Sequence, residues 1–173
     1  APEPSKGTSY LLPYDGDPAA VEQTGVLLAH VLQALSQTRA KEVLAFVDSC
    51  FSGAGGRSVL PPGARPLVVV KGPIAVANVA LMAASSGSEI SGPMPGGRGG
   101  VFSHYLAQGL GQAEADLDGD GQITLQELHA WIKPRVAREA QRDNRAQTPS
   151  LIVGARVGAA GELVVTWGVA RER

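Results

Sequence analysis

Residues 43–53 read VLAFVDSCFSG and combine a strand pattern with a polar ending. The first five residues form an uninterrupted apolar run, which is preceded by charged residues and followed by D-S-C-F-S-G. A short continuous apolar run is typical of a parallel strand that is buried on both faces. We therefore expect a central strand over residues 43–47, with Asp48 and Cys50 just beyond its carboxyl end.

Strand-like and helix-like patterns alternate along the rest of the chain, separated by loops rich in glycine and proline at residues 53–66 and 92–100. This alternation predicts an α/β fold in which helices cover a sheet. The expected strands are residues 9–12, 67–70, 76–84, 147–153 and 162–167, and the expected amphipathic helices span 18–38, 101–110 and 125–136.

Length and composition favour one folded domain. The chain has 173 residues, of which 44% are hydrophobic and 18% charged, and this combination excludes wholesale disorder. Its net charge of −1 gives no electrostatic reason to expect a nucleic-acid or membrane partner. The only cysteine, Cys50, forbids an intrachain disulfide and favours either a reducing compartment or a chain in which redox chemistry has no role. The location that we expect is the cytoplasm.

Asp48 and Cys50 are the first candidates for a functional site. Ligands of parallel α/β sheets bind beyond the carboxyl ends of the strands. Side chains alternate along an extended chain, so two residues that are two apart project to the same side. A lone cysteine is more often a small buried hydrophobic residue, but the position of Cys50 after the strand favours a reactive thiol beside a carboxylate.

The motif D-S-C-F-S-G at residues 48–53 resembles the nucleophile motif of caspase-fold cysteine peptidases, most closely their metacaspase-like bacterial branch. The resemblance runs from Ser9 to Val165 and implies a caspase-like sheet of mostly parallel strands with helices on both faces, in one domain that lacks its N-terminal strands. It also implies hydrolysis of peptide bonds by a Cys-His dyad with Cys50 as the nucleophile. Other segments that match in order are SYLLPYDGDP (9–18), NVALMAASSGSE (78–89), GGVFSHYLAQGL (99–110) and QTPSL (147–151).

The general base of this dyad is expected upstream of the chain. Caspase-type enzymes carry the histidine about 50 residues before the cysteine, which from Cys50 falls at or before Ala1. His30, His104 and His129 share their helix faces with glutamine or lysine, so we expect all three on solvated faces. A thiol with a pKa of about 8.5 is only slightly ionised at neutral pH without a base, so this chain alone should be nearly inert.

The resemblance assigns Asp48 to the pocket for the residue before the scissile bond, which predicts a polypeptide substrate with Lys or Arg at that position. A carboxylate forms charge-assisted hydrogen bonds with either side chain. The alternative is that Asp48 only caps local N–H groups. Further substrate contacts are expected near the end of the next strand, with Ser85 and Glu89 as candidates.

Three arginines in the glycine-rich loops, Arg57, Arg65 and Arg98, suit self-processing by an enzyme of basic specificity. The alternative for these exposed loop residues is a purely solubilising role.

The segment DLDGDGQITLQE, residues 116–127, fits the ligand spacing of an EF-hand calcium loop. Gly121 permits the sharp turn that this loop needs, and Ile123 is expected to point inward. Ca²⁺ is therefore a possible cofactor. The expected ligands are Asp116, Asp118, Asp120, Gln122 through its backbone carbonyl, Thr124 through a water, and Glu127.

The alternative for this segment is a structural turn between two helices in which Thr124 and Glu127 form a capping box. Two functions from different classes thus remain open. One is a cysteine endopeptidase of basic specificity, and the other is a calcium-binding or scaffolding module with a protease-like fold that does not catalyse.

Overall fold

A computed structural model describes residues 10–17, 20–48, 76–86, 89, 91–96, 99–159 and 162–167 of the chain. Within these ranges the protein has a mixed α/β fold of four helices and seven short strands. In chain order the elements are β1 (Tyr10–Leu11), α1 (Val21–Thr24), β2 (Val26–Leu27), α2 (Leu28–Ser36), β3 (Val43–Val47), β4 (Val79–Ala83), α3 (Val101–Gly111), β5 (Gln122–Thr124), α4 (Leu125–Arg142), β6 (Ser150–Val153) and β7 (Val164–Trp167).

The main sheet has the strand order β3-β4-β6 within the described residues. β3 runs parallel to β4, with Val43 opposite Val79 and Val47 opposite Ala83, and β6 is antiparallel to β4. The predicted strand over residues 43–47 is confirmed, but the central strand of this sheet is β4, in which all five residues are buried. β3 lies at its edge with five half-buried residues, because only one of its sides is paired in the described sheet.

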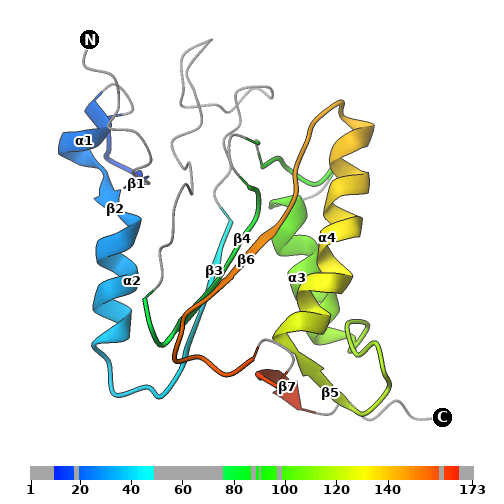
Figure 1. Cartoon of the computed structure of the whole chain (residues 1–173). Helices are drawn as coiled ribbons and strands as arrows, with labels where there is room; N and C mark the ends of the chain where they lie inside the picture. Colours follow the sequence, from blue (N-terminus) through cyan, green and yellow to red (C-terminus); the bar gives the residue numbers. More distant parts are fainter. Residues whose placement is uncertain are drawn as a thin grey trace.

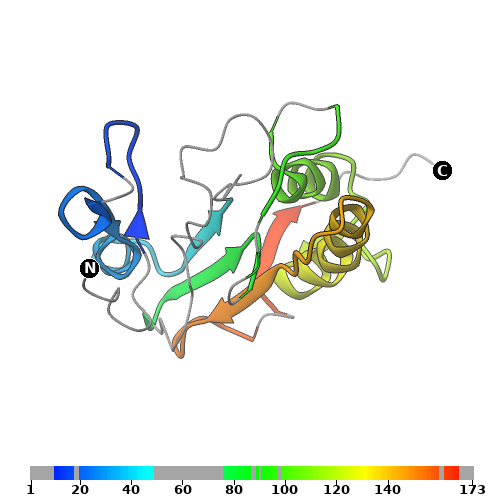
Figure 2. The same cartoon turned by 90° about the horizontal axis from the view of Figure 1, so that it is seen from above.

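Helices cover both faces of this sheet, as the sequence predicts. The alternation of side chains along β4 divides the core, because Val79 and Leu81 pack with α2 while Ala80 and Met82 pack with α3 and α4. Figure 1 shows the resulting layers, with α2 on one side of the sheet and the α3–α4 pair on the other. Figure 2 shows the same arrangement from above.

The helix predicted over residues 18–38 is interrupted in the structure. α1 ends before Gly25, whose backbone is extended (ψ 155°), and the next two residues form β2. β2 pairs antiparallel with β1, Tyr10 opposite Leu27 and Leu11 opposite Val26. The pairing of β2 with β1 thus overrides the local helical pattern. The periodicity of the apolar residues does not indicate this pairing.

The two long helices α3 and α4 pack against each other beside the sheet. Phe102 of α3 and Leu128, Ile132 and Val136 of α4 are fully buried in the core they share. β7 is a predicted strand, but it pairs antiparallel with β5 and not with the main sheet. Among the described helices none is both long and apolar enough to span a bilayer.

Candidate functional site

Asp48 follows β3 directly and meets the N-terminus of α3. Leu44 and Phe46 point to the α3–α4 side of the sheet, and Asp48 continues this alternation. Asp48 Oδ2 accepts a hydrogen bond of 3.1 Å from the backbone N–H of Ser103 and one of 2.6 Å from the Ser103 hydroxyl. The first N–H groups of a helix lack intrahelical partners, and Gly100 at the N-cap of α3 has no side chain to supply one. Asp48 therefore caps α3 from another element.

The second oxygen of this carboxylate is in a different situation. Asp48 Oδ1 is buried and has no hydrogen-bond partner in the described part of the chain. Leaving a buried acceptor unpaired costs free energy, so such atoms are uncommon in folded proteins. The carboxylate thus caps the N-terminus of α3, 55 residues away, and not the local N–H groups of the alternative interpretation, and its second oxygen has no donor among the described residues.

Glu89, a predicted substrate contact, lies in the loop after β4. Its carboxylate accepts hydrogen bonds from Ser86 in the same loop and from Thr148 in the segment before β6. Glu89 Oε2 accepts from the backbone N–H and hydroxyl of Ser86 at 3.2 and 3.1 Å and from the backbone N–H of Thr148 at 2.6 Å. Glu89 Oε1 accepts from the Thr148 hydroxyl at 2.9 Å. Ser85 contributes its carbonyl, which accepts from the Ser150 hydroxyl at 3.3 Å. The substrate-binding roles of Ser85 and Glu89 stay predictions.

Gln147 is a buried polar residue that the sequence did not single out. It is 1% exposed, and its Oε1 accepts from the N–H of Gly92 at 3.1 Å and from Arg145 Nη1 at 2.9 Å. Its Nε2 donates to the carbonyl of Ala84 at 3.1 Å. Gln147 thereby ties the end of β4 and the loop before α3 to the segment before β6, and only its place in the QTPSL motif hinted at a role.

Cys50, Arg57, Arg65 and Arg98 lie outside the described residues, so their predicted roles stay predictions. The histidines are described. His30 and His104 are exposed, as predicted. His129 is half-buried, and its Nε2 lies 3.0 Å from the carbonyl oxygen of Pro149, so its helix face is not simply solvated.

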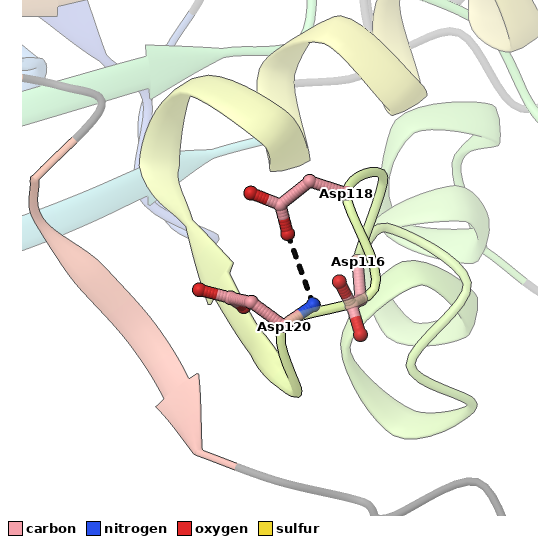
Figure 3. Close-up of side chains that lie close together, drawn as sticks. All are labelled: Asp116, Asp118 and Asp120. Atoms are coloured by element: carbon pink, nitrogen blue, oxygen red, sulfur yellow. Dashed lines mark hydrogen bonds between the residues drawn. The ribbon is translucent and has the colours of Figure 1, made fainter.

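The acidic loop between α3 and α4 brings three predicted calcium ligands together. Asp116, Asp118 and Asp120 each offer a carboxylate oxygen, and these oxygens lie within 4.8 Å of one another. Figure 3 shows the three side chains around one turn, with a hydrogen bond of 3.1 Å from the N–H of Asp120 to Asp118 Oδ1. Gly121 has a φ of +85°, which a residue with a side chain rarely adopts, and Ile123 is fully buried, both as predicted.

Glu127 closes this loop by hydrogen bonds to its two ends. Glu127 Oε1 accepts from the N–H of Leu117 at 3.0 Å and of Asp118 at 3.4 Å, and Oε2 accepts from the N–H and hydroxyl of Thr124 at 2.9 and 2.8 Å. The N–H of Glu127 donates in turn to the Thr124 hydroxyl, which completes a capping box of α4, as the alternative interpretation of this segment expects. Burial raises the pKa of Glu127, but these hydrogen bonds lower it by more, so its pKa lies below the ordinary value.

This donor set fits a hard divalent cation such as Ca²⁺, which takes six to eight oxygen ligands. Three carboxylates already converge, while Glu127 would have to exchange backbone donors for a metal. The loop lies at the end of α3 that is distant from Asp48, because α3 begins beside Asp48 and ends at Gly111 before the loop (Figure 1). A bound metal would therefore hold the α3–α4 turn and not contact the Asp48 carboxylate.

Comparisons of the chain with protein-family models, with curated proteins and with solved structures give no match.

Proposed function

We propose that this chain is the core of a cysteine endopeptidase that cleaves after Lys or Arg, with Cys50 as the nucleophile. The observation that carries this proposal is the Asp48 carboxylate at the carboxyl end of β3. One of its oxygens is held by Ser103, the other is buried and has no partner among the described residues, and the cysteine follows two residues later in the sequence. A carboxylate in this state suits a guanidinium or ammonium group, which brings donors and a compensating charge.

In this proposal the Cys50 thiolate attacks the carbonyl carbon of the scissile bond, and the Cys50 N–H contributes to stabilising the oxyanion. A histidine from sequence before Ala1 accepts the thiol proton and returns it to the leaving amine. Water then hydrolyses the thioester and releases the acid product. His30 and His104 are exposed, and His129 contacts the carbonyl of Pro149. These positions support a general base other than the three histidines of this chain.

The fold supports a caspase-like arrangement at the level of its sheet. β3 and β4 are parallel and apolar, and helices cover both faces. The mostly parallel sheet of such an enzyme is part of the proposal, because the described sheet contains one parallel and one antiparallel pairing.

The test uses the full natural chain and fluorogenic peptides that end in Arg, Lys or a neutral residue. We expect cleavage after Arg and Lys that Cys50→Ala abolishes, while the thermal midpoint of that variant stays close to the parent value. Activity that survives Cys50→Ala would falsify the assignment of the nucleophile. The same preparations report on self-processing, since cuts after Arg57, Arg65 or Arg98 should disappear in Cys50→Ala.

A second candidate function is a calcium-binding or scaffolding module that does not catalyse. The observation that favours it is the convergence of Asp116, Asp118 and Asp120. Isothermal titration of the full natural chain with CaCl₂ tests it, with Asp118→Asn as the variant that removes one charged ligand. Calcium binding together with no cleavage of any basic peptide would support this function over the peptidase.

A further inference from the structure

The Asp48 carboxylate is held in place by one residue of another element. Within the described part of the chain, the hydrogen bonds that it accepts come from Ser103, one from the backbone N–H at 3.1 Å and one from the hydroxyl at 2.6 Å, and both end on Oδ2. Two donors on the same oxygen fix the plane and direction of the carboxylate more tightly than one does. The orientation of Asp48 therefore depends on the side chain at position 103.

Gly100 also lies directly against this carboxylate. A Cβ atom at Gly100 would overlap Asp48 Oδ2 and approach Cγ and Oδ1 within 2.9 Å. The backbone of Gly100 is in an ordinary extended conformation, with φ −78° and ψ 153°, so this glycine is needed for space and not for its conformational freedom. The carboxylate thus lies between the Ser103 hydroxyl and the Cα of Gly100.

The Asp48 carboxylate also lies at the N-terminus of α3. α3 has eleven residues, and the partial positive charge at the start of a helix stabilises a nearby anion. With Oδ2 used by Ser103, the remaining acceptor is Oδ1, which is buried and unpaired among the described residues. A cationic side chain is the ligand that both supplies a donor to Oδ1 and balances the charge.

We propose that Ser103 is a positioning residue that sets specificity for basic substrates by directing Asp48 Oδ1 toward the substrate cation. This inference rests on the proposed peptidase function and adds a second residue to its specificity pocket. Ser103 acts through Asp48 and does not itself touch the substrate. A residue that only capped α3 would change stability without changing the preference for Arg.

The experiment compares four variants in the full natural chain. Ser103→Ala removes the hydroxyl and keeps the N–H, Ser103→Thr restores a hydroxyl, and Gly100→Ala pushes the carboxylate away from Ser103. Gly111→Ala, at the far end of α3, is the matched control because nothing lies within 4 Å of a Cβ at that position. The readouts are the ratio of kcat/KM for Arg over neutral peptides and the thermal midpoint of each variant.

We expect Ser103→Ala to lower the Arg-to-neutral ratio by about tenfold, as for one hydrogen bond to a charged group. Ser103→Thr should recover most of the ratio, Gly100→Ala should lower it at least as much as Ser103→Ala, and Gly111→Ala should leave it unchanged. An unchanged ratio in Ser103→Ala with a lowered thermal midpoint would overturn the inference and leave Ser103 as a structural partner of the cap.

A binding measurement separates this inference from the peptidase proposal. Argininamide is titrated calorimetrically into the Cys50→Ala chain, alone and combined with Ser103→Ala, Ser103→Thr or Asp48→Asn. We expect Asp48→Asn to abolish binding, Ser103→Ala to weaken it by about tenfold and Ser103→Thr to restore it. Loss of activity in Cys50→Ala tests the nucleophile, whereas binding that is absent or insensitive to Ser103→Ala contradicts the positioning role whether or not the chain is a peptidase.

Discussion

Thr148 donates two hydrogen bonds to the carboxylate of Glu89, from its backbone N–H to Oε2 at 2.6 Å and from its hydroxyl to Oε1 at 2.9 Å. The two residues are 59 positions apart, and Ser86 donates to the same carboxylate. This arrangement joins the loop after β4 to the segment before β6. The Glu89 carboxylate therefore cross-links two segments that are distant in sequence, at the same end of the main sheet as Asp48.

Removing the hydroxyl from this cross-link should destabilise the protein. We expect Thr148→Val to lower the free energy of unfolding by about 1.5 to 3 kcal/mol, as for a hydrogen bond to a charged group. Thr38→Val, which removes an exposed hydroxyl bonded to the Leu35 carbonyl, should change it by about 0.5 kcal/mol at most. Urea unfolding of the three proteins measures both changes, and equal effects of the two substitutions would contradict the cross-link.

Glu89→Gln distinguishes this structural role from the predicted role of Glu89 in substrate binding. The cross-link predicts lower stability with an unchanged ratio of Arg to neutral cleavage. A reduced ratio would instead place Glu89 among the substrate contacts.

An element could be predicted from the sequence where the residues that determine it lie within one segment, and not where contacts between distant segments determine it. The strand over residues 43–47 and the helix beginning at Val101 follow from apolar patterns within single segments, and both are confirmed. The break at Gly25 could not be predicted, because β2 exists through its pairing with β1 and the local pattern is helical.

The same distinction holds for the candidate sites. The acidic loop has its ligands within a short stretch, so spacing alone predicted that Asp116, Asp118 and Asp120 would converge. Ser103 bonds to Asp48, 55 positions away, and Gln147 bonds to Ala84, 63 positions away. Serine and glutamine are common residues, and the sequence around them does not indicate such distant partners. The sequence leaves open that Asp48 caps local N–H groups, whereas the N–H group that it caps belongs to Ser103, 55 positions away.

The contact between α3 and α4 predicts different effects at two glycines of one helix. A Cβ at Gly109 would lie 3.1 Å from the ring of buried Trp131, whereas one at Gly111 would meet nothing within 4 Å. Replacing glycine by alanine in a helix gains about 0.5 to 1 kcal/mol in backbone terms, and at Gly109 the overlap opposes this gain. We expect Gly111→Ala to be more stable than Gly109→Ala by about 1 kcal/mol or more in thermal unfolding, and the reverse order would exclude close packing at Gly109.

The charge of Asp48 and its capping role can be separated by two substitutions in the full natural chain. Asparagine is as good a helix cap as aspartate, so Asp48→Asn should keep the thermal midpoint near that of the parent, while Asp48→Ala should lower it. Both should reduce cleavage after Arg relative to a neutral residue by about tenfold to a hundredfold, since each loses a charge-assisted bond. A ratio that Asp48→Asn leaves intact is incompatible with the specificity pocket.

Calcium should stabilise the fold through the acidic loop. The clustered carboxylates repel one another without a cation, and binding to the native state alone adds ~2.7 kcal/mol at a free calcium concentration one hundred times the dissociation constant. Thermal unfolding with millimolar CaCl₂, MgCl₂ or EDTA measures the shift, which should be larger for calcium because magnesium demands a tighter octahedron. The double variant Asp116→Ala with Glu127→Gln should lose it; a parent protein that shows no shift would leave the loop as a structural turn.

The lowered pKa of Glu127 predicts how the metal-free protein responds to acid. Burial raises this pKa, but the hydrogen bonds from Thr124, Leu117 and Asp118 lower it by more, so the folded state holds the proton less tightly than the unfolded state does. The stabilisation from this carboxylate is therefore complete above the unfolded-state pKa of about 4.3 and is lost as the pH falls through the lower folded-state value. Urea unfolding in EDTA should show this loss in the parent between pH 7 and about pH 3, which is roughly one unit below the unfolded-state pKa. Glu127→Gln should be less stable than the parent at neutral pH, and the difference should shrink below about pH 4. A constant difference between Glu127→Gln and the parent across this range would mean that the hydrogen bonds seen around Glu127 do not depend on its charge.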